Sequence, residues 1–154
     1  MYDGCDWIRG DQQIAQHVKS QPQAQRLQEI TGIGTLTASA ATATVVDAKL
    51  YRNGRQFAAW LGLVPRQMSS GGKTKLGRIS RRGDAHLRSL LVQGARSTLQ
   101  SALKQASDRA TRLQLYGRVG YHKTLVAIAN KHARIIWAIM ARDEAYDPQA
   151  WQRA

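Results

Sequence analysis

The clearest structural signal in this chain is the stretch DAHLRSLLVQGARSTLQSAL, residues 84–103. Its apolar and small residues recur at steps of three and four, the spacing of one face of an α-helix. These residues are Leu87, Leu90, Leu91, Ala95, Thr98, Leu99, Ala102 and Leu103. Asp84 comes just before them, where an aspartate caps the first backbone N–H groups of a helix. The stretch therefore predicts a long helix with one buried face.

Helical periodicity also covers most of the remaining chain. Pro22 divides a first helical region, and Asn53 is placed to cap a short helix. The expected helical segments are residues 11–30 in two pieces, 35–46, 54–61, 108–117 and 122–142. The threonines of residues 35–46 leave a strand open there. Since no stretch shows convincing strand alternation, we expect an all-α, compact helical domain.

The chain is strongly basic, and this bears on its partners. Its 154 residues include 23 Lys and Arg against 10 Asp and Glu, a net charge of +13. Such an excess predicts attraction to the phosphates of nucleic acid, with an anionic membrane or an acidic protein as alternatives. No apolar run is long enough to span a membrane, and a single cysteine excludes an internal disulfide framework. We expect a cytoplasmic protein without membrane contact.

Residues 27–38 form the first candidate contact with nucleic acid. An apolar helix end, the turn Gly32-Ile33-Gly34 and a second helix describe a helix-hairpin-helix-like element. Glycine permits positive φ in such a turn, and the free N–H groups that start the second helix suit a phosphate oxygen. Gly32 and Gly34 are therefore candidate binding residues. An ordinary tight connection between packed helices explains the same pattern.

Residues 63–83 show no sustained periodicity, so we expect a long basic loop rich in serine and glycine. The window 66–88 holds seven cations and one acid, +6 of the net charge. Cations among glycines suit a phosphate backbone, and arginine adds two-pronged hydrogen bonding. A solvated, partly disordered loop is the plain alternative. The candidate binding residues are Arg66, Lys73, Lys75, Arg78, Arg81, Arg82 and Arg88.

The same segment contains Ser69 and Ser70. A serine hydroxyl is a poor nucleophile unless a base removes its proton or nearby charges stabilise the product. No base is evident from local spacing, since His86 lies sixteen residues beyond Ser70. By itself, a serine among glycines is typical of a linker. The four histidines show no metal-ligand spacing, so we assign no metal site.

Several of these motifs resemble a known family. They are AAWLGLVPRQMSSGGK at residues 58–73, LGRISRRGD at 76–84 running into Leu87 and Arg88, GIG at 32–34 and ANKHAR at 129–134. Together they strongly resemble the C-terminal domain of bacterial insertion-sequence transposases, called the transposase family 20 domain. This family is related to Piv-type DNA invertases. The resemblance covers about residues 11–148.

The resemblance implies a recombinase that cuts and rejoins DNA, guided by a structured bridge RNA of the element. In this family, the serine directly before the glycine of the motif attacks a DNA phosphate. That position is Ser70 here, with Ser69 as the fallback. The cations expected to hold phosphates near this serine are Arg66, Lys73, Arg78 and Arg82. The implied partners are DNA, a guide RNA and, in the full-length context, further copies of the chain, in a bacterial cytoplasm.

The family also implies parts that this sequence does not show. Full-length members carry an N-terminal ribonuclease-H-like domain whose four acidic residues bind Mg²⁺, joined through a helical region. We therefore expect residues 11–30 to end that helical region and residues 31–148 to form the domain that bears the serine and binds DNA. Residues 1–10 stay unassigned, and 149–154 form a tail.

These departures shape the expected activity. We expect no cofactor in this chain, with Mg²⁺ only where the acidic domain is present, and nucleic-acid binding without recombination by the chain alone. A non-catalytic nucleic-acid-binding protein is the main alternative. The Gln-rich first helix also leaves an assembly module open.

Overall fold

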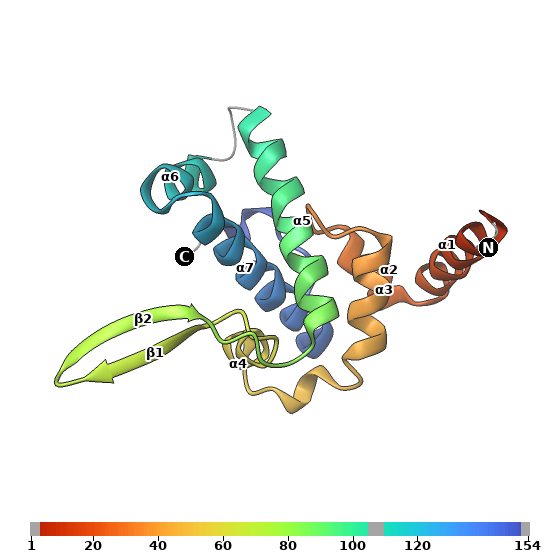
Figure 1. Ribbon diagram of the computed structural model, residues 1–154. Coiled ribbons are helices and arrows are strands. Elements are labelled where there is room, and N and C mark those ends of the chain that lie inside the picture. The colour runs from red at the N-terminus through yellow and green to blue at the C-terminus, as the bar shows by residue number, and fades with distance from the viewer. Residues whose placement is uncertain (1–3, 105–109, 152–154) are drawn as a thin grey trace.

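The computed structural model describes residues 4–104 and 110–151, and these are mostly helical (Figure 1). The helices are α1 (Gly4–Ser20), α2 (Pro22–Gln28), α3 (Thr35–Thr44), α4 (Gly54–Trp60), α5 (Ala85–Lys104), α6 (Ala110–Val119) and α7 (Tyr121–Arg142). Short 3-10 turns cover Ala48–Leu50 and Pro148–Trp151. Two strands, β1 (Pro65–Ser70) and β2 (Lys73–Ile79), form one antiparallel hairpin. The mostly helical fold class is confirmed.

The helices α5 and α7 pack against each other at the centre of the molecule (Figure 1). Burial of each large aliphatic side chain between them contributes about 2 kcal/mol to folding. The buried residues include Leu87, Leu91, Ala95 and Leu99 of α5 and Ile128, Ala129, Ala133 and Ile136 of α7. The helices α2, α3 and α4 cover this pair, so one core runs through the described chain. Within the described ranges, no helix has the length and hydropathy of a membrane span.

The N-terminal part divides at Pro22, as predicted. Residues 35–44 are helical, which removes the strand alternative for them. The helix α1 begins already at Gly4 and extends away from the body, although its buried Val18 joins the core (Figure 1). The unassigned first residues therefore belong in part to a helix.

Both predicted helix caps are confirmed. The Asn53 carboxamide oxygen accepts a hydrogen bond of 2.9 Å from the backbone N–H of Gln56 at the start of α4. The Asp84 carboxylate accepts one of 2.6 Å from the backbone N–H of Leu87 at the start of α5. Each cap satisfies an N–H group that the first turn of a helix leaves without a partner. The two caps thus mark the starts of the helices that come directly before and directly after the hairpin in the sequence.

The expectation of an irregular loop over residues 63–83 is wrong. Residues 65–79 form the hairpin, closed by Gly71 and Gly72 with φ of +63° and +77°. Two consecutive positive φ angles fit the tight turns that follow the twist of a hairpin, and only glycine adopts them easily. A Gly-Gly pair between two runs is a hairpin signal. The alternation that normally accompanies it is absent, because neither strand has an apolar face to bury.

Backbone contacts fix the base of the hairpin to the end of α4. The N–H of Ser80 donates to the Val64 carbonyl at 3.0 Å, and the N–H of Arg81 donates to the Gly62 carbonyl at 3.2 Å. The two chain segments at this point approach so closely that side chains are excluded between them. The hairpin therefore leaves the helical body in a defined direction.

Replacing Gly83 by alanine tests this close approach. Gly83 has a φ of +90°, and a Cβ atom there would lie 1.7 Å from the Trp60 carbonyl oxygen. We expect Gly83→Ala to lower the free energy of unfolding by about 3 kcal/mol, measured by urea denaturation. Gly71→Ala is the control, because its φ of +63° is strained but no atom lies within 4 Å. It should cost about 1 kcal/mol, and equal losses in the two variants would contradict the contact.

Candidate nucleic-acid interface

The hairpin projects from the helical body and carries Ser70 at its tip (Figure 1). Ser70 is exposed and pairs with Lys73 directly across the turn. Opposed residues in an antiparallel ladder point to the same face, with Cβ atoms about 5 Å apart. Lys75 lies two positions further along β2, so alternation puts it on that face too. The hairpin thus brings Ser70, Lys73 and Lys75 together on one exposed face.

Two other predicted residues of the hairpin lie differently. Ser69 pairs with Thr74 in the ladder, and its side chain is outside the described part of the structure. Arg78 is exposed and lies near the base, where the register shifts because β2 has one more residue than β1. Arg78 therefore does not share the position of the two lysines beside the turn.

Further arginines surround the base of the hairpin. Arg66 donates from Nη2 to the Ser80 carbonyl at 3.3 Å, and its side chain remains exposed. Arg81 and Arg82 follow β2 directly and are both exposed. Arg81 has a φ of +54°, which is unusual for a residue other than glycine. The base is therefore a tight, positively charged turn.

Arg88 has a different role from the other predicted cations. It lies half-buried on α5, and its Nη1 donates to the carbonyls of Leu61 at 3.1 Å and Arg82 at 3.3 Å. One guanidinium thus joins the end of α4 to the segment that follows β2. Arg88 positions the hairpin, and direct contact with phosphate remains a prediction for it.

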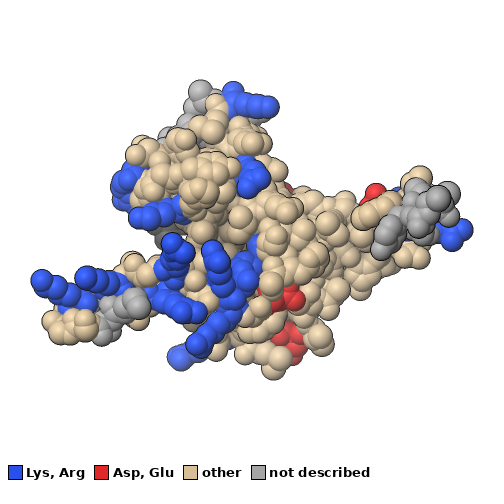
Figure 2. Space-filling view, in the orientation of Figure 1, with Lys and Arg blue, Asp and Glu red and all other residues tan. Residues whose placement is uncertain are grey.

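The charges of the hairpin are not neutralised within the described structure. The ion pairs of the described residues join Arg26 to Asp143 and Arg142 to Glu144. Neither involves the hairpin. Figure 2 shows Lys and Arg side chains along the hairpin and over the adjoining part of the body, and no Asp or Glu side chain visible on this face lies on the hairpin. This surface suits a polyanion.

The turn between α2 and α3 packs against α5. Gly32 has a φ of +93°, and a Cβ atom there would lie 2.1 Å from Thr98 Oγ1 and 2.6 Å from the Gly94 carbonyl oxygen. Packing against α5 therefore accounts for the glycine at this position. This agrees with the alternative interpretation of residues 27–38, an ordinary tight connection between packed helices. Gly34 is exposed and directly precedes α3. Binding of phosphate by this helix-hairpin-helix-like element stays a prediction.

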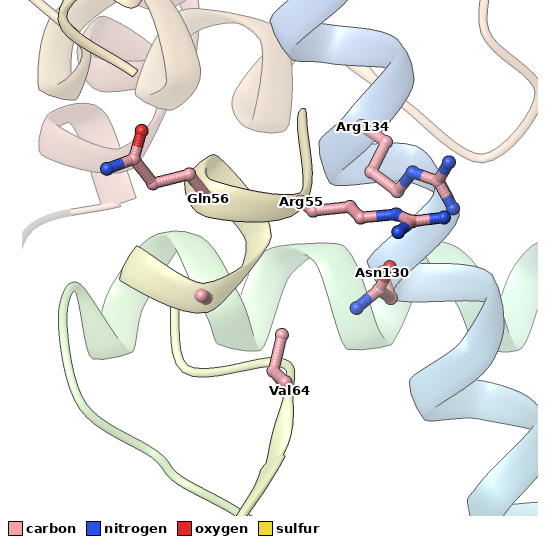
Figure 3. Close-up of a pocket in the computed structure, with 6 residues that line it drawn as sticks. Arg55, Gln56, Val64, Asn130 and Arg134 are labelled. Atoms are coloured by element: carbon pink, nitrogen blue, oxygen red, sulfur yellow. The ribbon is translucent and has the colours of Figure 1, made fainter. Parts of the chain in front are cut away.

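A groove between α4 and α7 was not predicted from the sequence. It is open, has a volume of about 490 Å³ and lies beside the start of β1 (Figure 3). Arg55 and Arg134 extend toward the same side of it, with Asn130 next to them. The residues that line it are Arg55, Gln56, Ala59, Val64, Asn130 and Arg134. The spacing of Asn130 and Arg134, four residues apart in one helix, was the signal available in the sequence.

The hairpin contains no carboxylate or imidazole that could take the proton of the Ser70 hydroxyl. Residues 65–79 contain no acid and no histidine, and the Ser70 hydroxyl makes no hydrogen bond with a described residue. Among the described side chains, no three His, Cys, Asp or Glu residues come together as a metal site. The hairpin itself therefore offers no carboxylate ligand for Mg²⁺.

Elsewhere, burial raises the pKa of Tyr51, which packs on Phe57 and Trp60.

Comparison with known proteins gives a consistent result. A family model described as "Transposase IS116/IS110/IS902 family" matches residues 24–111. A probable family 20 transposase of Pseudomonas aeruginosa is 48% identical over 141 residues, which are 91% of this chain and 42% of that protein. The transposase for insertion sequence element IS1111A of Coxiella burnetii is 41% identical over 137 residues, 88% of this chain and 38% of that protein.

A third relative also matches most of this chain and less than half of its own length. The transposase for insertion sequence element IS1328 of Yersinia enterocolitica is 41% identical over 145 residues, 92% of this chain and 43% of that protein. The chain thus spans about two fifths of the length of the curated relatives that it matches.

Replacing Arg88 by glutamine tests its positioning role. Two carbonyl groups lose a charged donor, so we expect the free energy of unfolding to fall by about 2 kcal/mol. Hydrogen exchange of the backbone N–H of Ser80 and Arg81 should also become faster. Arg78→Gln is the matched control and should change stability by less than about 0.5 kcal/mol, because Arg78 is exposed. If the two variants were equally stable, Arg88 would not hold the hairpin base.

Proposed function

This chain belongs to the transposase IS116/IS110/IS902 family, and we propose that it is the portion of such a transposase that binds DNA and presents a serine to it. The observation that carries this proposal is the place of Ser70. It stands exposed at the tip of a projecting hairpin, on the same face as Lys73 and Lys75. A phosphate of the DNA backbone, attracted by the two ammonium groups, would lie beside the hydroxyl.

The proposed chemistry is transfer of a phosphodiester from DNA to the protein. Ser70 Oγ attacks the phosphorus atom and forms an Oγ–P bond, while a P–O bond of the DNA breaks. The hydroxyl proton is given up, and the departing DNA oxygen takes one, so atoms and charge balance. The number of phosphodiester bonds is unchanged, and no external energy source is needed. Lys73 and Lys75 stabilise the negative charge on the other phosphate oxygens.

Activation of the serine has to come from outside the hairpin. Residues 65–79 contain no carboxylate or imidazole to act as a base, and no three His, Cys, Asp or Glu side chains cluster among the described residues. We therefore propose that this chain alone holds DNA without rejoining it. The resemblance assigns Mg²⁺ to an acidic N-terminal domain of the longer family members. A structured guide RNA and self-association in the full-length context belong to the same proposal.

A non-catalytic nucleic-acid-binding protein is the second candidate. One observation favours it, which is that the Ser70 hydroxyl makes no hydrogen bond with any described residue. Under this alternative, the same cations bind the phosphate backbone and the serine is part of the tight turn. The two candidates make the same prediction for the lysines and different predictions for Ser70.

Substitution of Ser70 by alanine separates the two candidates. The chain is placed in the Pseudomonas aeruginosa relative in exchange for the segment to which it is 48% identical. With cognate element DNA, the chimera should form a covalent protein–DNA adduct that survives denaturing electrophoresis. Ser70→Ala should abolish the adduct and change DNA affinity less than about twofold, because a hydroxyl contributes little beside two charges.

Ser89→Ala, on the exposed start of α5, is the control and should keep the adduct. An adduct that persists in Ser70→Ala but is lost in Ser69→Ala would move the nucleophile to the neighbouring serine. Absence of any adduct in the unmodified chimera, with DNA still bound, would support the non-catalytic candidate.

Neutralising the two lysines beside Ser70 tests DNA binding by the chain itself. We expect Lys73→Gln with Lys75→Gln to weaken binding to a 20-base-pair duplex about tenfold in 0.1 M salt. The slope of log affinity against log salt should fall by about 1, because the two lysines hold one phosphate and the loss of that contact means fewer counterions released on binding. Fluorescence anisotropy over a salt series measures both.

The control removes two positive charges elsewhere. Arg9→Gln with Lys19→Gln changes exposed residues of α1, away from the hairpin (Figure 1). It lowers the net charge from +13 by the same two units. Equal effects of the two double variants would mean that only overall charge, and no hairpin contact, binds the DNA.

A further inference from the structure

We infer that the groove between α4 and α7 is a second DNA-binding site, in which Arg55 and Arg134 hold one backbone phosphate. This inference rests on the proposed function, because it extends the path of the same DNA from the hairpin onto the body. The evidence comes from the helix crossing, the charge of the groove and its position next to β1.

The crossing of α4 and α7 fixes the origin of both arginines. A Cβ atom at Gly54 would lie 3.1 Å from the Cα and Cβ atoms of Arg134, so the two helices are in close contact there. Arg55 is the next residue after Gly54. The two side chains therefore start from neighbouring points on two packed helices. Figure 3 shows both extending over the same side of the groove.

The two guanidinium groups have no partner of opposite charge. Both arginines are exposed, and neither guanidinium group forms an ion pair or hydrogen bond with a described residue. Like charges held beside each other repel, and an anion between them replaces this repulsion by attraction. Planar guanidinium groups bind phosphate through paired hydrogen bonds. A phosphate is therefore the ligand that fits this rim.

The rest of the groove suits a sugar-phosphate chain. Its lining includes Ala59 and the half-buried Val64, and apolar surface of this kind accommodates sugar carbons. The Asn130 amide donates to the Leu63 carbonyl at 3.3 Å, which fixes the carboxamide at the edge of the groove. No acidic residue lines the groove. The lining thus adds no repulsion to a bound phosphate.

The groove opens where the hairpin begins. Val64 lines it and directly precedes Pro65, the first residue of β1. Strands rise about 3.3 Å per residue, so Ser70 stands about 17 Å beyond Pro65 along β1. The two proposed phosphates would therefore bind near opposite ends of the hairpin, at different positions along the DNA. The arginines at the hairpin base, Arg66, Arg81 and Arg82, continue the positive surface between them.

The test replaces both groove arginines in the full chain. We expect Arg55→Gln with Arg134→Gln to weaken binding to the 20-base-pair DNA duplex about tenfold in 0.1 M salt and to lower the salt slope by about 1. Arg9→Gln with Lys19→Gln, which removes the same charge from α1, should have a much smaller effect. Arg55→Lys with Arg134→Lys should retain the salt slope, because it keeps both charges. Circular dichroism and urea unfolding establish that each variant is folded.

The distance between the two sites supplies a second readout. Substitutions more than about 10 Å apart without shared partners usually have additive effects. The quadruple variant with Lys73→Gln and Lys75→Gln should therefore lose affinity by the product of the two separate losses. A quadruple variant no weaker than either double variant would place all four side chains on one phosphate and overturn the inference of a second site.

Other outcomes separate this inference from the proposed function. If the groove variant matches the α1 control while the hairpin lysines keep their effect, the groove inference is overturned and the function stands. If the groove and hairpin variants both match the control, DNA binding by this surface fails as a whole. A loss confined to a 20-base-pair RNA duplex would overturn the assignment of the groove to DNA.

Discussion

The close contact between the backbone after α4 and the backbone after β2 determines how this molecule presents its charged surface. Ser80 and Arg81 donate to the carbonyls of Val64 and Gly62, and Arg88 joins both segments from α5. An isolated two-stranded hairpin is marginally stable in water. Without this contact the strands would lack a fixed direction. The position of Ser70 relative to the helical body depends on it.

The second constraint is electrostatic. Seven cations lie between residues 66 and 88, and the described ion pairs neutralise none of them. Mutual repulsion of these charges opposes folding, while the core of α5 and α7 stabilises the fold enough to hold them on one surface. When a phosphate chain is bound, these cations are attracted to it, and their electrostatic contribution then favours the folded state. The stability of the hairpin and its affinity for DNA are therefore linked, because a ligand that binds only the folded state stabilises it.

The sequence predicts the parts of this fold that depend on local interactions. The long helix after Asp84, the cap at Asn53 and the break at Pro22 follow from neighbouring residues, and all three are present. The hairpin was not predicted, because its strands bury no apolar face and so show no alternation of apolar and polar residues. The pair Gly71-Gly72 was a local signal for a hairpin turn. The resemblance, rather than periodicity or charge, singles out Ser70. The groove and the role of Arg88 depend on contacts between helices distant in sequence, and the spacing of Asn130 and Arg134 shows only one wall of the groove.

The hairpin also has two outer edges whose backbone groups are unpaired within the described sheet. Such edges readily accept a third strand from another molecule. In the free protein, the lysines and arginines repel the hairpin of a second copy and keep this edge closed to it. DNA bound along the same surface would cancel that repulsion. The positive charge of the hairpin thus opposes pairing of its edges with those of a second copy.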